Sequence, residues 1–165
     1  MVLGLAAGVL LVRSQIFFRL GATAEFAPKD VRISNISDTS FTVSWTTDRE
    51  TSGFVKWGQD SASLDRTELD ELSQSFVHLL TLRTLSPQTT YFFKISSGGE
   101  EFDNNGIPWQ VTTGPTLPIP IKTNLVSGSV LSASGQPAEN TLVYLTVGGG
   151  SLLSTITSQT GTWVA

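Results

Sequence analysis

The sequence has 165 residues, no cysteine and a formal net charge of −4. Without cysteine, disulfides, thiolate metal sites and a cysteine nucleophile are excluded, so a domain of this size must rely on its apolar core. Residues 23–113 hold 7 basic and 13 acidic side chains and no cluster of Lys or Arg, which argues against a nucleic-acid partner because phosphate binding needs a basic patch.

The first 22 residues are mainly apolar, with an uninterrupted apolar run over residues 1–12 that ends at Arg13. A helix of twelve residues rises only about 18 Å, whereas the hydrocarbon core of a membrane is about 30 Å thick. Three interpretations compete: a signal peptide, a buried helix, and a membrane helix that begins before Met1 and ends in interfacial aromatic and basic residues. We favour the third. It predicts a single-pass protein of the cell membrane with the membrane as a partner, an anchor at residues 1–22 and extracellular β domains.

Residues 28–113 read as short strands separated by turn signals. The clearest is residues 39–47, where Phe41, Val43 and Trp45 alternate with small polar residues, a period of two that is typical of a half-buried strand. A turn is predicted at 48–53 and a hairpin loop at 98–106. The seven expected strands lie at 29–36, 39–47, 54–58, 66–67, 76–82, 90–96 and 107–113. Seven short strands without a strong helix predict an antiparallel β-sandwich.

The segment 85–95 combines a tight turn with a strand. Leu85 can fill the base of the core, Pro87 restricts φ in the turn, and Tyr91 can bury its ring while its hydroxyl is hydrogen-bonded. Together with the Trp45 strand and the sequence Val-Lys-Trp-Gly at 55–58, this segment resembles a fibronectin type III domain. The resemblance spans residues 28–113 and implies an immunoglobulin-like sandwich of seven antiparallel strands, with Trp45 in the core and Tyr91 bonding back across the corner.

Within that family, the stretch from Trp45 to Gly58 resembles the version found next to bacterial surface domains and at the front of purple acid phosphatases. The second likeness extends to the sandwich only, because no metallophosphatase set of Asp, His and Asn follows in the sequence.

A proline-rich linker, residues 114–123, leads to a second β-rich stretch at 124–165. That stretch resembles the opening of a carboxypeptidase regulatory-like, or transthyretin-like, domain. The matching residues are Gly128, Val130, Gly135, Pro137, Val143 and Leu145. Such a domain completes a seven-stranded sandwich, whereas about four strands are expected here. We therefore predict an incomplete β domain that is poorly ordered or packs opportunistically.

Three groups of side chains are candidates for a site. His78, the only histidine, has no Ser, Cys or metal partner in sequence and is interpreted as structural. A loop with several hard oxygen ligands could hold Ca²⁺, but its spacing is not that of an EF-hand and suits a turn; its residues are Glu100, Glu101, Asp103, Asn104 and Asn105. The loop with Asp48, Arg49 and Glu50 is expected to lie beside this acidic loop, where it would form either a binding surface or a solvated hairpin. No residue is assigned as catalytic, cofactor-binding or metal-binding.

Two functional hypotheses follow. The first is a non-catalytic, membrane-anchored extracellular spacer or protein-binding module, whose partners are other surface proteins or further domains of the same chain. The second is the accessory N-terminal part of a larger secreted hydrolase, such as a phosphatase-like or carbohydrate-active enzyme.

Overall fold

The computed structural model describes residues 24–70, 72, 74–118 and 124–165. These residues form twelve strands, preceded by one helical turn at 24–26. The strands are β1 (Lys29–Ser34), β2 (Phe41–Thr51), β3 (Gly53–Gly58), β4 (Arg66–Leu69), β5 (Ser75–Leu82), β6 (Thr90–Ser97), β7 (Glu100–Phe102), β8 (Trp109–Thr112), β9 (Ser127–Ser129), β10 (Leu142–Thr146), β11 (Leu152–Ile156) and β12 (Thr162–Val164).

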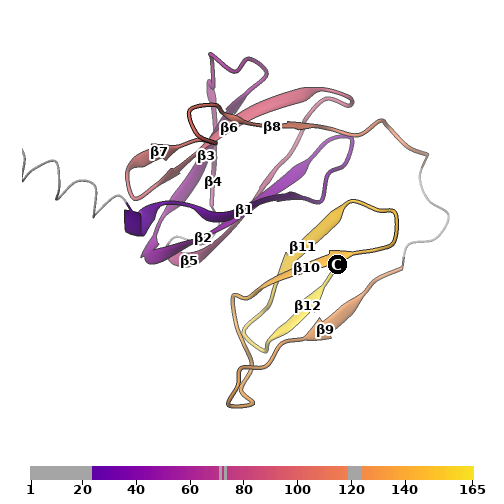
Figure 1. The fold of residues 1–165 in the computed structure, drawn as a ribbon. Helices are drawn as coiled ribbons and strands as arrows, with labels where there is room; N and C mark the ends of the chain where they lie inside the picture. Colours follow the sequence, from indigo (N-terminus) through magenta and orange to yellow (C-terminus); the bar gives the residue numbers. More distant parts are fainter. Residues whose placement is uncertain (1–23, 71, 73, 119–123) are drawn as a thin grey trace, which may run out of the picture.

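Strands β1 to β8 form two antiparallel sheets that pack face to face (Figure 1). One sheet has the order β1-β2-β5, and the other has the order β4-β3-β6-β7 with β8 also paired to β6. The predicted all-β sandwich is confirmed, and so is the edge strand expected near residue 66. The described part of 28–113 contains eight strands and not seven, because the expected hairpin loop includes β7, which pairs with Ile95–Ser97.

The core lies between these sheets, and Trp45 is at its centre. The inward alternation predicted for β2 is confirmed, since Phe41, Val43 and Trp45 are fully buried. The other buried apolar side chains are Val55, Trp57, Leu80, Leu82, Leu85, Tyr91, Phe93, Ile95 and Val111. Burying aromatic rings of this size is the main favourable contribution to folding in a domain without disulfides.

The turn after β2 is shorter than predicted. β2 continues to Thr51, which pairs with Ser75 beyond an irregularity in the ladder, so the chain reverses at Ser52. Asp48 and Arg49 therefore lie in an extended strand, where ion pairs with Lys29 and Glu25 hold them. The sequence did not indicate these partners, because Lys29 begins β1 and Glu25 precedes it, and no local pattern links either residue to the end of β2.

The prediction of a single-pass membrane protein with a membrane partner is corrected. Within residues 24–70, 72, 74–118 and 124–165, no helix has the length and apolar character needed to cross a membrane. The segment 1–22, to which the anchor and the apolar N-terminal helix were assigned, lies outside the described residues. Among the described residues, only the turn at 24–26 is helical.

Residues 124–165 form two antiparallel ribbons, β10–β11 and β9–β12. Trp163 of β12 lies across Gly128 of β9, where a Cβ would come within 2.7 Å of the indole. β11 also contacts β1 of the sandwich, and Figure 1 shows the ribbons below that sheet. The interpretation of this part as an incomplete carboxypeptidase regulatory-like domain stays a prediction.

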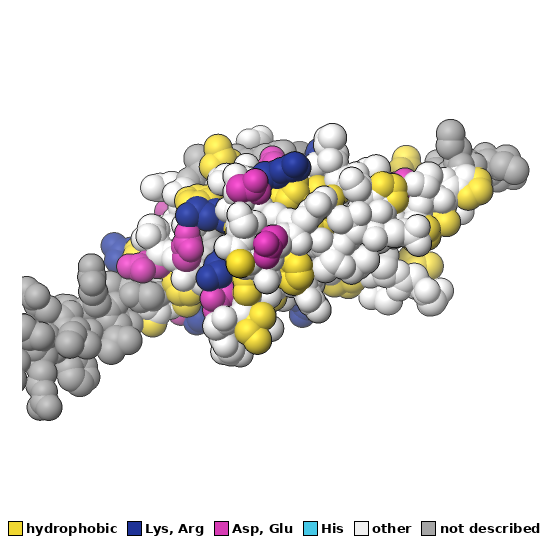
Figure 2. Space-filling model, turned by 90° about the horizontal axis from the view of Figure 1, so that it is seen from above, with side chains coloured by type: hydrophobic (Ala, Val, Ile, Leu, Met, Phe, Trp, Pro, Cys, Tyr) yellow, Lys and Arg dark blue, Asp and Glu magenta, His cyan; other side chains and the backbone are white. Residues whose placement is uncertain are grey.

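Charged side chains are unevenly distributed. In Figure 2, Lys, Arg, Asp and Glu side chains alternate over the left part of the described face, while the right part is almost free of them. In the sequence, residues 124–165 contain a single charged side chain, Glu139.

Candidate functional site

The only histidine lies in the core, in contact with an acidic partner. The Nδ1 atom of His78 hydrogen-bonds to Oδ2 of Asp70 at 2.6 Å, and both side chains are almost completely buried. The His78 ring stacks on Trp45 with 4.7 Å between centroids, and its Nε2 lies 3.4 Å from Oγ1 of Thr47. Enclosed in this way, the imidazole cannot reach a substrate. Its structural interpretation agrees with this geometry, whereas Asp70 was missed because it lies in an acidic loop without periodicity.

The acidic hairpin is held by lysines and by its own turn. Lys94 pairs with Oδ2 of Asp103 at 3.2 Å, and Lys56 forms an ion pair with Glu101. The other oxygen of Asp103 accepts a hydrogen bond from the Gly106 amide at 2.7 Å. That hydrogen bond, with the Lys94 ammonium, lowers the pKa of Asp103 below its ordinary value. Two of the five residues considered as calcium ligands, Glu101 and Asp103, are thus engaged in structural contacts.

The loop predicted beside this hairpin is the end of β2. Arg49 reaches back to Glu25 at 3.3 Å and lies 5.7 Å above the ring of Phe26. Phe26 in turn covers Gly98 at the start of the hairpin. The structure therefore brings the two predicted loops to one end of the sandwich, with the segment before β1 between them.

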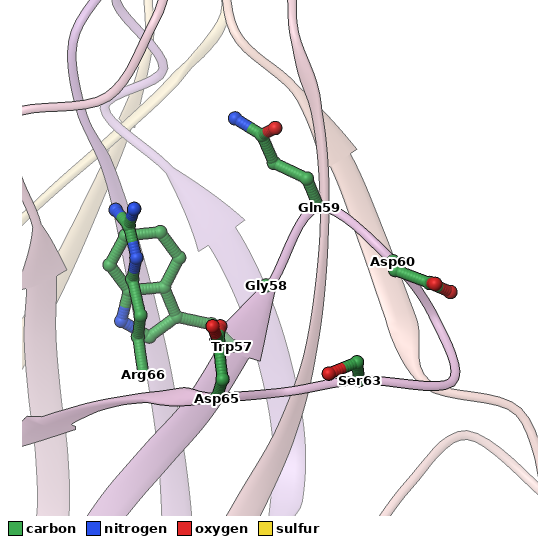
Figure 3. Close-up of a pocket in the computed structure, with 7 residues that line it drawn as sticks. All are labelled: Trp57, Gly58, Gln59, Asp60, Ser63, Asp65 and Arg66. Atoms are coloured by element: carbon green, nitrogen blue, oxygen red, sulfur yellow. The ribbon is translucent and has the colours of Figure 1, made fainter.

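A polar pocket of about 350 Å³ opens beside β3 and β4 (Figure 3). The Arg66 guanidinium lies 4.9 Å above the Trp57 ring, and Asp60 uses one oxygen to accept the Ala62 amide of its own turn. The residues lining the pocket are Trp57, Gly58, Gln59, Asp60, Ser63, Asp65 and Arg66. The pocket has acidic and basic side chains that can form hydrogen bonds. None of its hydroxyl groups is hydrogen-bonded to a side chain that could act as a base, as a catalytic nucleophile would be. It was not predicted, because residues 59–75 carry no periodic pattern.

Tyr91 forms the predicted corner beside this pocket. Its hydroxyl accepts a hydrogen bond from the Ser86 amide at 2.9 Å, and the Gln59 amide donates a second at 3.4 Å. Burial raises the pKa of Tyr91, but these hydrogen bonds and the Arg66 charge outweigh burial, so the pKa is lowered overall.

The outer face of β1 and β2 makes polar contacts with β10 and β11. We call this contact the polar junction; it consists of Arg32, Ser34, Asn35 and Ser44 on one side and Tyr144, Leu152 and Ser154 on the other. Thr42 and Ser44, two of the small polar residues that alternate with the apolar face of β2, are also buried. The alternation of β2 was correct, but its polar face is covered by a part of the chain a hundred residues away.

Among the residues that the structure describes, no three His, Asp or Glu side chains are grouped as metal ligands would be.

The chain is similar to one protein family and to several solved structures. No curated protein sequence matches the chain. Similar solved structures include the sensor domain of the anti-sigma factor RsgI4 of Pseudobacteroides cellulosolvens, with 14% identity over 56% of this chain and 97% of that chain, at a TM-score of 0.41. A redesigned β-sandwich protein has 26% identity over 53% of this chain and 94% of that chain, at a TM-score of 0.39. The FN1–FN3 domains of chicken CNTN1 have 15% identity over 84% of this chain and 53% of that chain, at a TM-score of 0.35.

One family model matches residues 28–113, the same limits that the strand pattern and the tyrosine corner predict. Its description is "Purple acid Phosphatase, N-terminal domain". The likeness to the front part of purple acid phosphatases, first indicated by the stretch from Trp45 to Gly58, is thereby confirmed. Since the match covers just over half of the 165 residues, the chain belongs to the family of the purple acid phosphatase N-terminal domain.

Proposed function

We propose that residues 28–113 are a non-catalytic β-sandwich module that spaces and orients neighbouring parts of a larger protein. The observation that carries this proposal is the burial of His78 and Asp70 as a closed pair inside the core. General acid–base or nucleophilic catalysis requires a titratable group within reach of a substrate. Of the other acidic groups singled out in the sequence, Glu101 and Asp103 are engaged with lysines, and Asp48 pairs with Lys29.

A phosphatase assay tests the non-catalytic role. The purified chain is incubated with p-nitrophenyl phosphate and Fe³⁺, Zn²⁺ or Mn²⁺ from pH 4 to 8, and we expect release of nitrophenol no faster than in protein-free buffer. Metal-dependent turnover that is lost in a folded His78→Gln variant would overturn the proposal, because it would require an accessible His78.

The family match favours a second candidate, the accessory N-terminal part of a metallophosphatase. This function requires a surface that recognises a catalytic domain. Isothermal titration of the chain into a purple acid phosphatase catalytic domain lacking its own N-terminal domain should then give saturable heat. A fibronectin type III domain of similar size serves as the control. Equal heats for both proteins would reject this candidate and leave the spacer role standing.

A further inference from the structure

We propose that the outer face of β1 and β2 is an intramolecular docking surface on which the ribbon β10–β11 folds. In this view residues 124–165 are ordered by the polar junction and not by a core of their own. The inference goes beyond the spacer role and does not depend on whether the chain serves an enzyme.

The first argument is the lack of a core in residues 124–165. No apolar side chain in this range is buried, and Leu125, Leu131 and Val147 are more than half exposed. The buried side chains here are polar, Ser154 and Thr157. An isolated two-stranded ribbon is marginally stable at best in water. The stability of β10–β11 must therefore come from contacts outside the ribbon.

The second argument is the reciprocal hydrogen bonding of Asn35. Its side-chain oxygen accepts the Ser154 amide at 2.9 Å, and its side-chain nitrogen donates to the Ser154 carbonyl at 2.9 Å. Its own backbone amide donates to the Leu152 carbonyl at 2.8 Å. Asn35 thus pairs with the free edge of β11 as a neighbouring strand would. These bonds satisfy the Ser154 amide and the carbonyl groups of Ser154 and Leu152, which would otherwise need water.

The third argument is that the ribbon presents matching side chains on one face. Tyr144 and Ser154 are directly opposite each other in the β10–β11 ladder, so their side chains lie on the same side. The Tyr144 hydroxyl shares a hydrogen bond of 2.8 Å with Ser44, and Arg32 lies 4.6 Å above the Tyr144 ring. Ser154 shares a buried hydrogen bond of 2.6 Å with Ser34.

The polar character of this contact makes it specific for one register. Because side chains alternate along a strand, a slip of one residue would turn Tyr144 and Ser154 away from the sandwich. Ser34 and Ser44, both fully buried, would then lose their partners. A buried hydroxyl without a partner costs roughly as much as the hydrogen bond it forgoes, so the docked register is favoured over its neighbours.

Hydrogen exchange on the full-length chain tests this inference. The variant Asn35→Gly removes the side-chain bonds without straining the backbone, since φ is +50° at Asn35 and glycine adopts positive φ freely. Asn105→Gly is the matched control, because Asn105 has a φ of +57° but lies in the exposed hairpin after β7. We expect Asn35→Gly to lower amide protection in β10 and β11 by roughly tenfold or more, given the hydrogen bonds it removes. Protection in β2, β3 and β6 should stay unchanged, and Asn105→Gly should change neither part.

A second variant keeps the test decisive if Asn35→Gly also weakens the sandwich. The double substitution Tyr144→Phe and Ser154→Ala removes the ribbon's hydroxyls and leaves the sandwich sequence intact. Loss of protection in β10–β11 with a wild-type sandwich supports the docking surface. Wild-type protection of β10–β11 in this double variant and in Asn35→Gly would overturn it.

Discussion

At the scale of single residues, the Tyr91 hydroxyl joins the β6 strand to the turn before it through the Ser86 amide. Tyr91→Phe keeps the buried ring and removes this acceptor, so we expect the free energy of unfolding to fall by about 1–3 kcal/mol. The value should lie toward the lower end, because Ser86 is exposed and water can replace the hydroxyl. Urea denaturation at pH 7 measures the change. Gln59→Ala removes the longer hydrogen bond to the Tyr91 hydroxyl and should lower the free energy of unfolding by less. Equal stability of Tyr91→Phe and wild type would show that the hydrogen bond of the tyrosine corner does not stabilise the fold.

The ionisation of Asp103 makes the stability of the folded state depend on pH in the acidic range. Its pKa is lowered in the folded state by the Gly106 amide and by Lys94. The stabilisation is therefore complete above the unfolded-state pKa of about 3.9 and is lost as the pH falls through the lower folded-state pKa. In Asp103→Asn, stability should fall less between pH 5 and pH 2 than in the wild type, as followed by urea denaturation. Glu100→Gln removes the same charge from β7 and leaves the Lys94 contact, so it is the control. An unchanged pH profile in Asp103→Asn would show that the contact does not stabilise the fold.

At the same scale, the sequence allowed the buried aromatic residues to be predicted but not the polar partners. Trp45 and Tyr91 were assigned from strand alternation and from the corner motif, both of which are local. Asp70 and Asn35 bond to His78 and Ser154. No local rule connects Asn35 to a residue more than a hundred positions later, and both pairs exist because the folded chain brings them together.

At the scale of elements, the tight reversal from β2 to β3 depends on Gly53. A Cβ at Gly53 would lie 2.5 Å from Cζ2 of Trp45 and 3.3 Å from Nδ1 of His78. Gly53→Ala should therefore displace the stacked rings and cost about 1–3 kcal/mol, the usual range for overpacking. Gly148→Ala is the control, because no atom lies within 4 Å of a Cβ added there. Thermal denaturation compares the two; equal melting temperatures would indicate that Trp45 moves aside without cost.

The elements that differ from prediction are those that depend on neighbouring segments. β7 forms in a segment rich in turn residues because the edge of β6 offers backbone partners from Ile95 to Ser97. β2 extends through Asp48 and Arg49, where charge suggested a loop, because ion pairs with Lys29 at the start of β1 and with Glu25 before it hold those side chains. Propensity is a weak guide where pairing or packing decides the conformation.

At the scale of the whole molecule, the docking surface predicts that unfolding is coupled in one direction. Trp45→Ala removes a fully buried ring and should cost about 3–5 kcal/mol, a large part of a total of about 5–15 kcal/mol. If β10–β11 folds on the sandwich, conditions that unfold this variant should abolish amide protection in both parts together. Phe76→Ala, at a half-exposed aromatic position of β5, should leave both protected.

The reverse dependence should be absent. Disrupting the ribbon through Tyr144→Phe and Ser154→Ala should leave the sandwich melting temperature within about 2 °C of wild type, because no side chain of the sandwich core changes and Ser34 and Ser44 can hydrogen-bond to water once the ribbon has left. Protection of β10–β11 that persists after the sandwich has unfolded would contradict this one-way coupling.

The sequence alone determined the sandwich at residues 28–113, its buried aromatic face and its tyrosine corner, because alternation along a strand and turn chemistry are local properties. The tertiary structure decided which polar groups are buried, where the last strands of the chain lie and which side chains remain accessible. Each of these depends on contacts that form only when the chain folds: Asn35 meets Ser154 from 119 positions away, and His78 bonds to Asp70, which lies in a loop eight residues earlier with no periodic pattern. Such contacts leave no periodic trace in the chain, so the closed His78 pair and the polar junction could be read only from the folded molecule.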